Sequence, residues 1–207
     1  MFKSQYCQFG GFHDAQIIGY KNLDLLQDEI KDCSLRRTKD VAAPSLPPKT
    51  ITYELVEMSE AHRKLYDGVK NGVKEEADKI ELNASNLLAL TTRLRQATSA
   101  PSVLTSNEVE SSKVERAADI VRDLAASGEK VVVLSNFIEP VYKLAEMIKD
   151  LKVSVNTGDQ TDDIISKNVD RFQSGSDQAF IGTYGKVGTG LTLNAAAYMV
   201  CLDTPWT

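Results

Sequence analysis

The stretch Lys130-Val131-Val132-Val133-Leu134-Ser135-Asn136-Phe137 decides the fold class of this chain. Residues 131–134 are apolar without interruption, which is typical of a strand that is covered on both faces. Strands are covered on both faces when the sheet is parallel and lies between two layers of helices. This run therefore predicts an α/β domain built on a parallel sheet.

Helix and strand patterns alternate on both sides of this run. Ser112 and Glu115 have the spacing of a capping box, and Gly128 is well placed to end the helix that starts there. Alternation of strands and helices at this spacing predicts a parallel sheet with helices on both faces. Further strands are expected at 153–155, 179–182 and 198–202, and further helices at 139–149 and 162–172.

The first half of the chain has helical patterns and one short strand pattern. A short helix is expected within 17–35, with Asn22 as its cap. Ile51, Tyr53 and Leu55 alternate with polar residues, which predicts a half-exposed strand at the edge of the sheet. Helical patterns follow from Ser59 and over 85–96, and a polar linker is expected at 100–111.

Composition limits the possible classes of protein. A chain of 207 residues with 42% hydrophobic and 26% charged residues is typical of one or two globular domains. We expect a cytoplasmic protein without a membrane partner, because there is no secretory start and no apolar run of roughly 18 residues. The net charge of −5 argues against nucleic-acid binding by the whole surface. Three scattered cysteines predict neither a disulfide framework nor a metal site.

In a parallel sheet, ligands bind in the loops beyond the carboxyl ends of the strands. The segment 182–190 has four glycines and two threonines directly after a predicted strand. Freed backbone N–H groups and hydroxyls suit phosphate oxygens, although glycines equally suit a tight turn. The segment is not a Walker A loop, because no Gly-Lys-Ser/Thr ending follows the required spacer.

Several separated segments resemble, in the right order, the Swi/Snf-type ATPases of helicase superfamily two. The segments 130–137 and 183–193 resemble helicase motifs IV and V. The others are Leu35-Arg36-Arg37-Thr38-Lys39, Leu46-Pro47-Pro48-Lys49, Leu94-Arg95-Gln96, Asn156-Thr157-Gly158-Asp159-Gln160-Thr161 with Arg171-Phe172, and Leu202-Asp203-Thr204-Pro205-Trp206. The resemblance covers nearly the whole chain.

This resemblance implies a motor of two RecA-like lobes that closes over ATP and magnesium and moves along double-stranded DNA. The chain would supply the second lobe, with the first lobe of the same protein as its partner. Residues 1–47 would be the helical tail of the first lobe and a linker, 48–110 an edge strand and a helical protrusion, and 111–207 the second lobe. The implied DNA-backbone contacts are Asn136, Phe137, Gly158, Thr183 and Tyr184, and the implied nucleotide contacts are Gly188, Gly190 and Leu191.

The chain also departs from the family pattern. Val187 stands where glycine is usual, and Thr192 stands where asparagine is usual. No Gly-Lys-Thr loop is present, and the pair Asp28-Glu29 does not follow a buried strand. The chain ends at Thr207, before the arginines of motif VI. We therefore expect a truncated lobe with no catalytic residue, which binds neither ATP nor magnesium and is inactive on its own, although the intact protein would be an ATP-dependent helicase.

Two other functions remain open at this point. The chain could be a stand-alone interaction or regulatory module that kept the RecA-like fold without motor activity. It could also be an unrelated α/β enzyme with a small-molecule site at 188–190, which requires a catalytic histidine or acid there. His13 and His62 lie outside the alternating region and are expected to be ordinary surface or helix residues.

Overall fold

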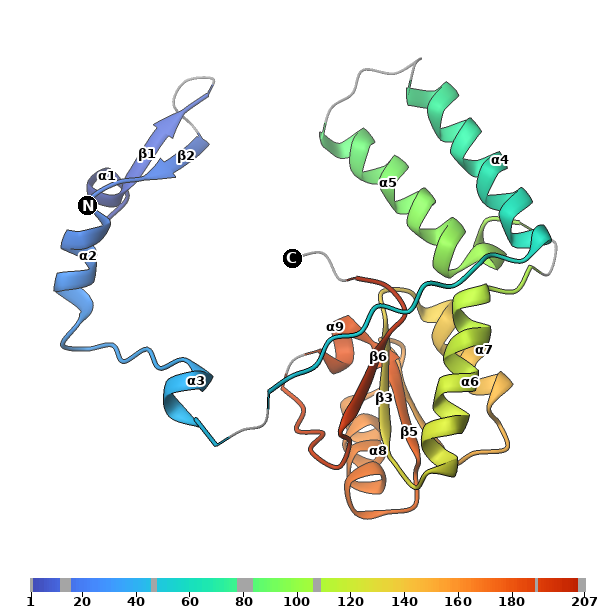
Figure 1. Cartoon of the computed structure of the whole chain (residues 1–207). Coiled ribbons are helices and arrows are strands. Elements are labelled where there is room, and N and C mark those ends of the chain that lie inside the picture. Colours follow the sequence, from blue (N-terminus) through green and yellow to red (C-terminus); the bar gives the residue numbers. More distant parts are fainter. Residues whose placement is uncertain are drawn as a thin grey trace. The chain divides into compact units, whose positions relative to one another are not determined.

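The computed structural model describes residues 2–11, 16–45, 48–77, 84–105, 109–188 and 190–204. The chain divides into two compact units, Met1–Tyr53 and Glu54–Thr207, whose elements are labelled in Figure 1. His13, Pro47 and Trp206, which carry parts of the sequence predictions, lie outside the described residues.

The first unit contains an antiparallel hairpin that the sequence patterns do not predict. Helix α1 (Phe2–Tyr6) precedes strands β1 (Cys7–Gly10) and β2 (Gln16–Tyr20), and helices α2 (Leu23–Ile30) and α3 (Lys39–Ala42) follow. The expected helix within 17–35 is therefore shorter, because its first residues form β2. Asn22 occupies the position before α2, but its side-chain Nδ2 donates to the carbonyl of Gln5 at 2.9 Å instead of capping the helix.

The second unit contains the predicted parallel sheet. Its strands are β3 (Val131–Ser135), β4 (Val153–Asn156), β5 (Ala179–Thr183) and β6 (Tyr198–Cys201), in the spatial order β4-β5-β3-β6. All three strand pairs are parallel, and every residue of β3 and β5 is buried. The fold class predicted from residues 131–134 is confirmed.

Helices cover both faces of this sheet, as Figure 1 shows. Helices α6 (Ser112–Ala126) and α7 (Ile138–Met147) pack on the face that holds Val131 and Val133. Helices α8 (Asp162–Ser174) and α9 (Tyr184–Val187) pack on the opposite face, which holds Val132 and Leu134. The uninterrupted apolar run of β3 thus serves two separate hydrophobic cores.

The two ends of α6 differ from each other in how well the sequence predicts them. Gly128 has a φ of +77°, and its N–H donates to the carbonyl of Ala125 at 3.0 Å, which confirms the predicted end. The predicted capping box is wrong: Ser111 holds the cap position and makes no side-chain cap bond. The Ser112 hydroxyl instead accepts the Ser59 N–H at 3.0 Å. A partner 53 residues away in the chain thus replaces the local one.

The predicted edge strand over 51–56 is also wrong. These residues form no strand, and the described sheet has no fifth member. Ile51, Tyr53 and Leu55, the apolar side chains of the alternating pattern, are 61%, 86% and 96% exposed. Alternation predicts a strand only where a sheet edge and an apolar surface are available to receive it. Here Glu54 instead pairs with Arg116 of α6 at 2.8 Å.

Two long helices precede the sheet, and a buried histidine of the first contacts both the second helix and α6. Helices α4 (Glu60–Ala77) and α5 (Ala84–Ser99) pack against each other, and a 3-10 turn, Pro101–Val103, follows α5. His62 lies in α4, which agrees with the expectation of a helix residue, but it is fully buried and not at the surface. Its Nε2 lies 2.8 Å from the Ala97 carbonyl, and its Nδ1 lies 3.3 Å from the Ser112 hydroxyl. Because a carbonyl only accepts, we assign the proton of the ring to Nε2.

Candidate functional site

The carboxyl ends of the four strands form one rim of the sheet. Ser135 pairs with Thr183, Asn156 pairs with Gly182, and Leu134 pairs with Cys201. Because all pairs are parallel and in this register, the loops after the strands open at the same edge. Along the rim, the order of these loops is 157–160, 184–191, 136–137 and 202–204.

Asp203, in the loop after β6, holds the loop after β3. Its Oδ2 accepts the Ser135 hydroxyl at 2.8 Å, and its Oδ1 accepts the Asn136 backbone N–H at 2.9 Å. The side-chain Nδ2 of Asn136 also donates to Asp203 Oδ1, and it donates to the Thr204 carbonyl at 3.0 Å. The Asp203 side chain is only 5% exposed. The Asn136 amide, predicted to contact DNA, is thus engaged within the protein.

Two cations lie beside the same carboxylate. Arg95 of α5 approaches Asp203 Oδ1 at 3.8 Å and donates to the Thr204 carbonyl. Burial lowers the pKa of the Lys113 ammonium, while the charge of Asp203 opposes this shift and the charge of Arg95 adds to it. The helices before the sheet therefore contribute positive charge to the rim, and the sequence patterns gave no sign of this proximity.

The loop after β5 lies against the loop after β6. The Tyr184 hydroxyl donates to the Asp203 carbonyl at 2.8 Å. Burial, followed by a hydrogen bond with Cys201, raises the pKa of the Tyr184 phenol well above its usual value. Thr183 is buried at 7% exposure and precedes α9 without making a side-chain cap bond. Thr183 and Tyr184 thus belong to the rim, with Tyr184 tied to the loop that holds Asn136.

The loop after β4 is fixed by a tyrosine from α7. The Tyr142 hydroxyl donates to Asp159 Oδ2 at 2.8 Å and lies 3.0 Å from the Thr157 hydroxyl. Hydrogen bonds from Thr157 and then from Tyr142 hold the pKa of Asp159 below its usual value. Gly158 lies between Thr157 and Asp159 and is exposed. The loop that the sequence assigns to DNA thus presents its glycine outward.

The glycine-rich segment after β5 lies beside a hollow of about 320 Å³. Gly188 is exposed, and its N–H donates to the Tyr184 carbonyl at 2.8 Å within α9. Gly190 has a φ of +82°, a conformation that L side chains rarely adopt. Lys186 pairs with Asp162 at 2.8 Å at the hollow. The hollow is lined by Asp162, Ile165, Ser166, Val169, Lys186, Gly190 and Leu191.

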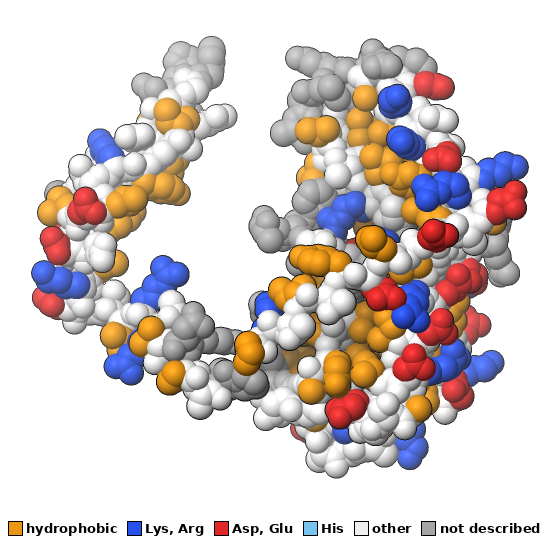
Figure 2. Space-filling view, in the orientation of Figure 1, with side chains coloured by type: hydrophobic (Ala, Val, Ile, Leu, Met, Phe, Trp, Pro, Cys, Tyr) orange, Lys and Arg blue, Asp and Glu red, His pale blue; other side chains and the backbone are white. Residues whose placement is uncertain are grey.

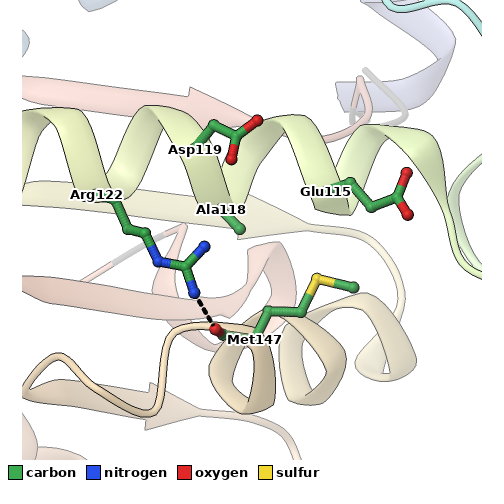
Figure 3. A pocket seen from close by; sticks show the side chains of 5 residues that line it. All are labelled: Glu115, Ala118, Asp119, Arg122 and Met147. Carbon is green, nitrogen blue, oxygen red and sulfur yellow. Dashed lines mark hydrogen bonds between the residues drawn. The ribbon is translucent and has the colours of Figure 1, made fainter.

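A second hollow, of about 300 Å³, lies between α6 and α7 (Figure 3). It is lined by Glu115, Ala118, Asp119, Arg122 and Met147, and the Arg122 guanidinium donates to the Met147 carbonyl. None of the residues predicted to bind DNA or nucleotide lies there. This hollow is a groove between two packed helices, and the candidate site is the rim.

The surface of the second unit away from the rim has mixed charge. Figure 2 shows acidic and basic side chains next to each other over the region that holds α6 in Figure 1. Ion pairs in this region include Arg116 with Glu54 at 2.8 Å and Arg122 with Asp150 at 3.5 Å. A surface of paired charges offers little net attraction to phosphates, so it does not compete with the rim as a candidate nucleic-acid surface.

The part of the chain that the structure describes holds neither a metal-binding cluster nor a membrane-spanning helix. No three His, Cys, Asp or Glu side chains gather there in a way that could hold a metal ion. None of its helices combines the length and the apolar character that crossing a membrane requires.

Family comparisons match almost the whole chain. Residues 4–103 match the SNF2-related domain, and residues 112–207 match the helicase conserved C-terminal domain. The first match covers unit 1 together with α4 and α5, and the second covers the sheet with its helices.

Relatives of this chain include longer helicases. An uncharacterised ATP-dependent helicase of Mycoplasma genitalium is 30% identical over 194 residues, which are 90% of this chain and 19% of that protein. The DNA repair protein RAD5 of Gibberella zeae is 30% identical over 129 residues, which are 56% of this chain and 11% of that protein. The chain thus spans about a fifth of the Mycoplasma helicase and about a tenth of the repair protein.

Solved structures share the fold. The Sulfolobus solfataricus SWI2/SNF2 ATPase core in complex with dsDNA has a TM-score of 0.66 and 20% identity, over 98% of this chain and 44% of that one. The C-terminal domain of a SWI2/SNF2 ATPase from the same organism has a TM-score of 0.62 and 17% identity, over 72% and 69%. At these identities the likeness concerns the fold, which is RecA-like.

Proposed function

Because the chain belongs to the Swi/Snf-type helicase-like proteins of superfamily two, we propose that its sheet is the second RecA-like lobe of an ATP-dependent motor that moves along duplex DNA. The partners in this proposal are double-stranded DNA and the first lobe of the same protein. The lobe would grip the DNA backbone with its rim and close one side of the ATP cleft with its glycine-rich segment.

One observation carries the DNA part of the proposal: three loops open side by side at one edge of the sheet. Neighbouring strands lie about 4.8 Å apart, so the loops of three strands span roughly 10 Å. One DNA strand rises about 3.4 Å per nucleotide along the helix axis, so this span corresponds to about three nucleotides measured along the axis. In this spatial order, Gly158 follows β4, Thr183 is the last residue of β5, and Asn136 follows β3. Contacts of this kind position a motor without reading base sequence.

The nucleotide part of the proposal rests on Gly188, Gly190 and Leu191. Both glycines are exposed, and Gly190 and Leu191 line the hollow beside α8. The exposed backbone of two glycines fits one wall of a nucleotide site. The described residues contain no cluster of magnesium ligands. ATP with magnesium would supply the phosphoryl group whose transfer to water drives movement. The residues of this chain would hold and orient the nucleotide from one side.

Thr183→Val tests the DNA part of the proposal. Valine keeps the shape of threonine and removes only a hydroxyl, which makes no cap bond within the protein. We expect the variant chain to bind a 20-base-pair duplex more weakly by roughly threefold to tenfold, equally for all base sequences. Fluorescence anisotropy at several salt concentrations measures this, and the logarithmic salt slope should fall by less than about one unit because no charge is lost.

Ser127→Ala is the matched control, because Ser127 follows α6 at the opposite edge of the sheet. It also loses one hydroxyl, which donates to the Asp123 carbonyl at 2.9 Å. Its DNA affinity should equal that of the unmodified chain. A loss in Thr183→Val that depends on base sequence, or an equal loss in both variants, would show that the rim is not the DNA track.

A further inference from the structure

Asp203 is a buried acidic residue of the rim that is proposed to bind phosphates. Its carboxylate accepts three hydrogen bonds from Ser135 and Asn136, and its side chain is 5% exposed. A negative charge at a phosphate-binding surface weakens binding by Coulomb repulsion. Asp203 must therefore favour DNA binding in another way, and that effect must outweigh the repulsion.

The hydrogen bonds identify such an effect. The Asn136 N–H and the Ser135 hydroxyl are both directed to the same carboxylate, and the Phe137 N–H donates to Ser135 Oγ at 3.1 Å. One carboxylate thus defines the backbone of the whole loop between β3 and α7. Hydrogen bonds to a buried charged acceptor are among the stronger ones in proteins, so this loop is held in one conformation.

The same group reaches the helices that precede the sheet. Arg95 of α5 lies 3.8 Å from Asp203 Oδ1 and donates to the Thr204 carbonyl, 109 residues away in sequence. Tyr184 donates to the Asp203 carbonyl from the loop after β5. The loops after β3, β5 and β6 and the end of α5 therefore meet at one residue.

We propose that Asp203 is a positioning residue of the DNA-gripping rim: its side-chain oxygens fix the Ser135–Asn136 loop by accepting hydrogen bonds from it. This rests on the proposed DNA contact of the rim. It adds that the shape of the loop depends on the acceptor atoms of Asp203.

Two substitutions separate the acceptor role of Asp203 from the effect of its charge. Asp203→Asn removes the charge but keeps an acceptor oxygen for the Asn136 N–H, whereas Asp203→Ala removes both. If charge alone mattered, both variants would bind duplex DNA more tightly, because a repulsive charge is lost. A positioning role predicts that Asp203→Ala binds on the order of tenfold more weakly, while Asp203→Asn binds at least as tightly as the unmodified chain.

Amide hydrogen exchange of Asn136, measured by NMR on the 207-residue chain, reports the position of the loop without DNA. We expect the Asn136 N–H to exchange at least tenfold faster in Asp203→Ala and to remain protected in Asp203→Asn. Fluorescence anisotropy with a 20-base-pair duplex gives the affinities of the same samples. If Asp203→Ala does not fold, Ser135→Ala replaces it, because it removes one donor while the carboxylate stays paired, and a few-fold loss of affinity is expected.

Each outcome decides the proposal. Equal or tighter DNA binding by Asp203→Ala, or by Ser135→Ala in its place, overturns it. Equal weakening in Asp203→Asn and Asp203→Ala also overturns it, because the ion pair with Arg95 would then be sufficient. Failure of the unmodified chain to bind the duplex contradicts the proposed function, and the Asn136 exchange rates still show whether Asp203 fixes the loop.

Discussion

At the scale of single residues, buried polar side chains connect segments that are far apart in the chain. His62 contacts Ala97 and Ser112, which lie 35 and 50 residues away, and Ser112 also accepts the Ser59 N–H. Buried polar groups are costly unless they are hydrogen-bonded, so each partner in such a set depends on the others. One imidazole and its hydrogen-bond partners therefore connect α4, α5 and α6.

His62→Ala should destabilise the second unit by about 2–4 kcal/mol, because it leaves a cavity and an unpaired buried carbonyl at Ala97. Urea unfolding followed by circular dichroism measures the free energy of unfolding. His62→Gln is the control: its amide can still donate to Ala97, so the loss should be smaller. Equal stability of His62→Ala and the unmodified chain would show that this connection does not depend on the imidazole.

At the scale of elements, the helix α4 contains two glycines that nothing in the structure requires. Gly68 and Gly72 are exposed, and a methyl group added at either would meet no atom within 4 Å. Gly128, after α6, has equally open surroundings but a φ of +77°. The three positions thus differ in backbone conformation and not in available space.

Alanine at these positions should therefore have opposite effects. Gly68→Ala and Gly72→Ala should each stabilise α4 by about 0.5–1 kcal/mol, because glycine loses more conformational freedom in a helix. Gly128→Ala should destabilise the chain by about 1 kcal/mol, because alanine is strained at positive φ. Midpoints of urea unfolding for the three variants give the comparison. A stabilising Gly128→Ala would contradict the strain argument.

Close packing, and not backbone conformation, requires glycine at Gly182 near the end of β5. A Cβ at Gly182 would lie 2.6 Å from the Asn156 carbonyl oxygen and 2.4 Å from a methyl group of Val187. Close approach of β4 and α9 to β5 therefore requires a residue without a side chain. This packing brings the loops after β4 and β5 together at the rim, so Gly182 contributes to the site through the geometry of the sheet.

At the scale of the whole molecule, the proposed function assigns to this chain one side of a motor. The sequence has no Gly-Lys-Ser/Thr phosphate loop, and the described residues contain no cluster of magnesium ligands. We expect the 207-residue chain to show no ATP turnover, with or without duplex DNA. A coupled phosphate-release assay measures this. Turnover that duplex DNA stimulates and that Gly190→Ala abolishes would contradict the prediction, since a contaminating ATPase would not respond to that change.

The sequence by itself determined the class of the second unit and the edge at which its candidate site lies. Buried strands such as β3 are apolar throughout because both faces are covered, and this signal is local. Parallel strands end at one edge, so the predicted order of elements already brought Gly158, Thr183 and Asn136 to one rim. Gly128 ended α6 as predicted because positive φ is a property of a single residue.

Only the tertiary structure decided which polar groups meet. Asp203 pairs with Ser135 and Asn136 across 68 and 67 residues, and nothing near Asp203 in the sequence specifies these partners. The alternating pattern of Ile51, Tyr53 and Leu55 formed no strand, and these side chains are exposed, because a period-two pattern does not by itself supply a partner strand. Patterns along the chain encode local conformation, whereas hydrogen-bond partners and sheet edges depend on segments that only folding brings together.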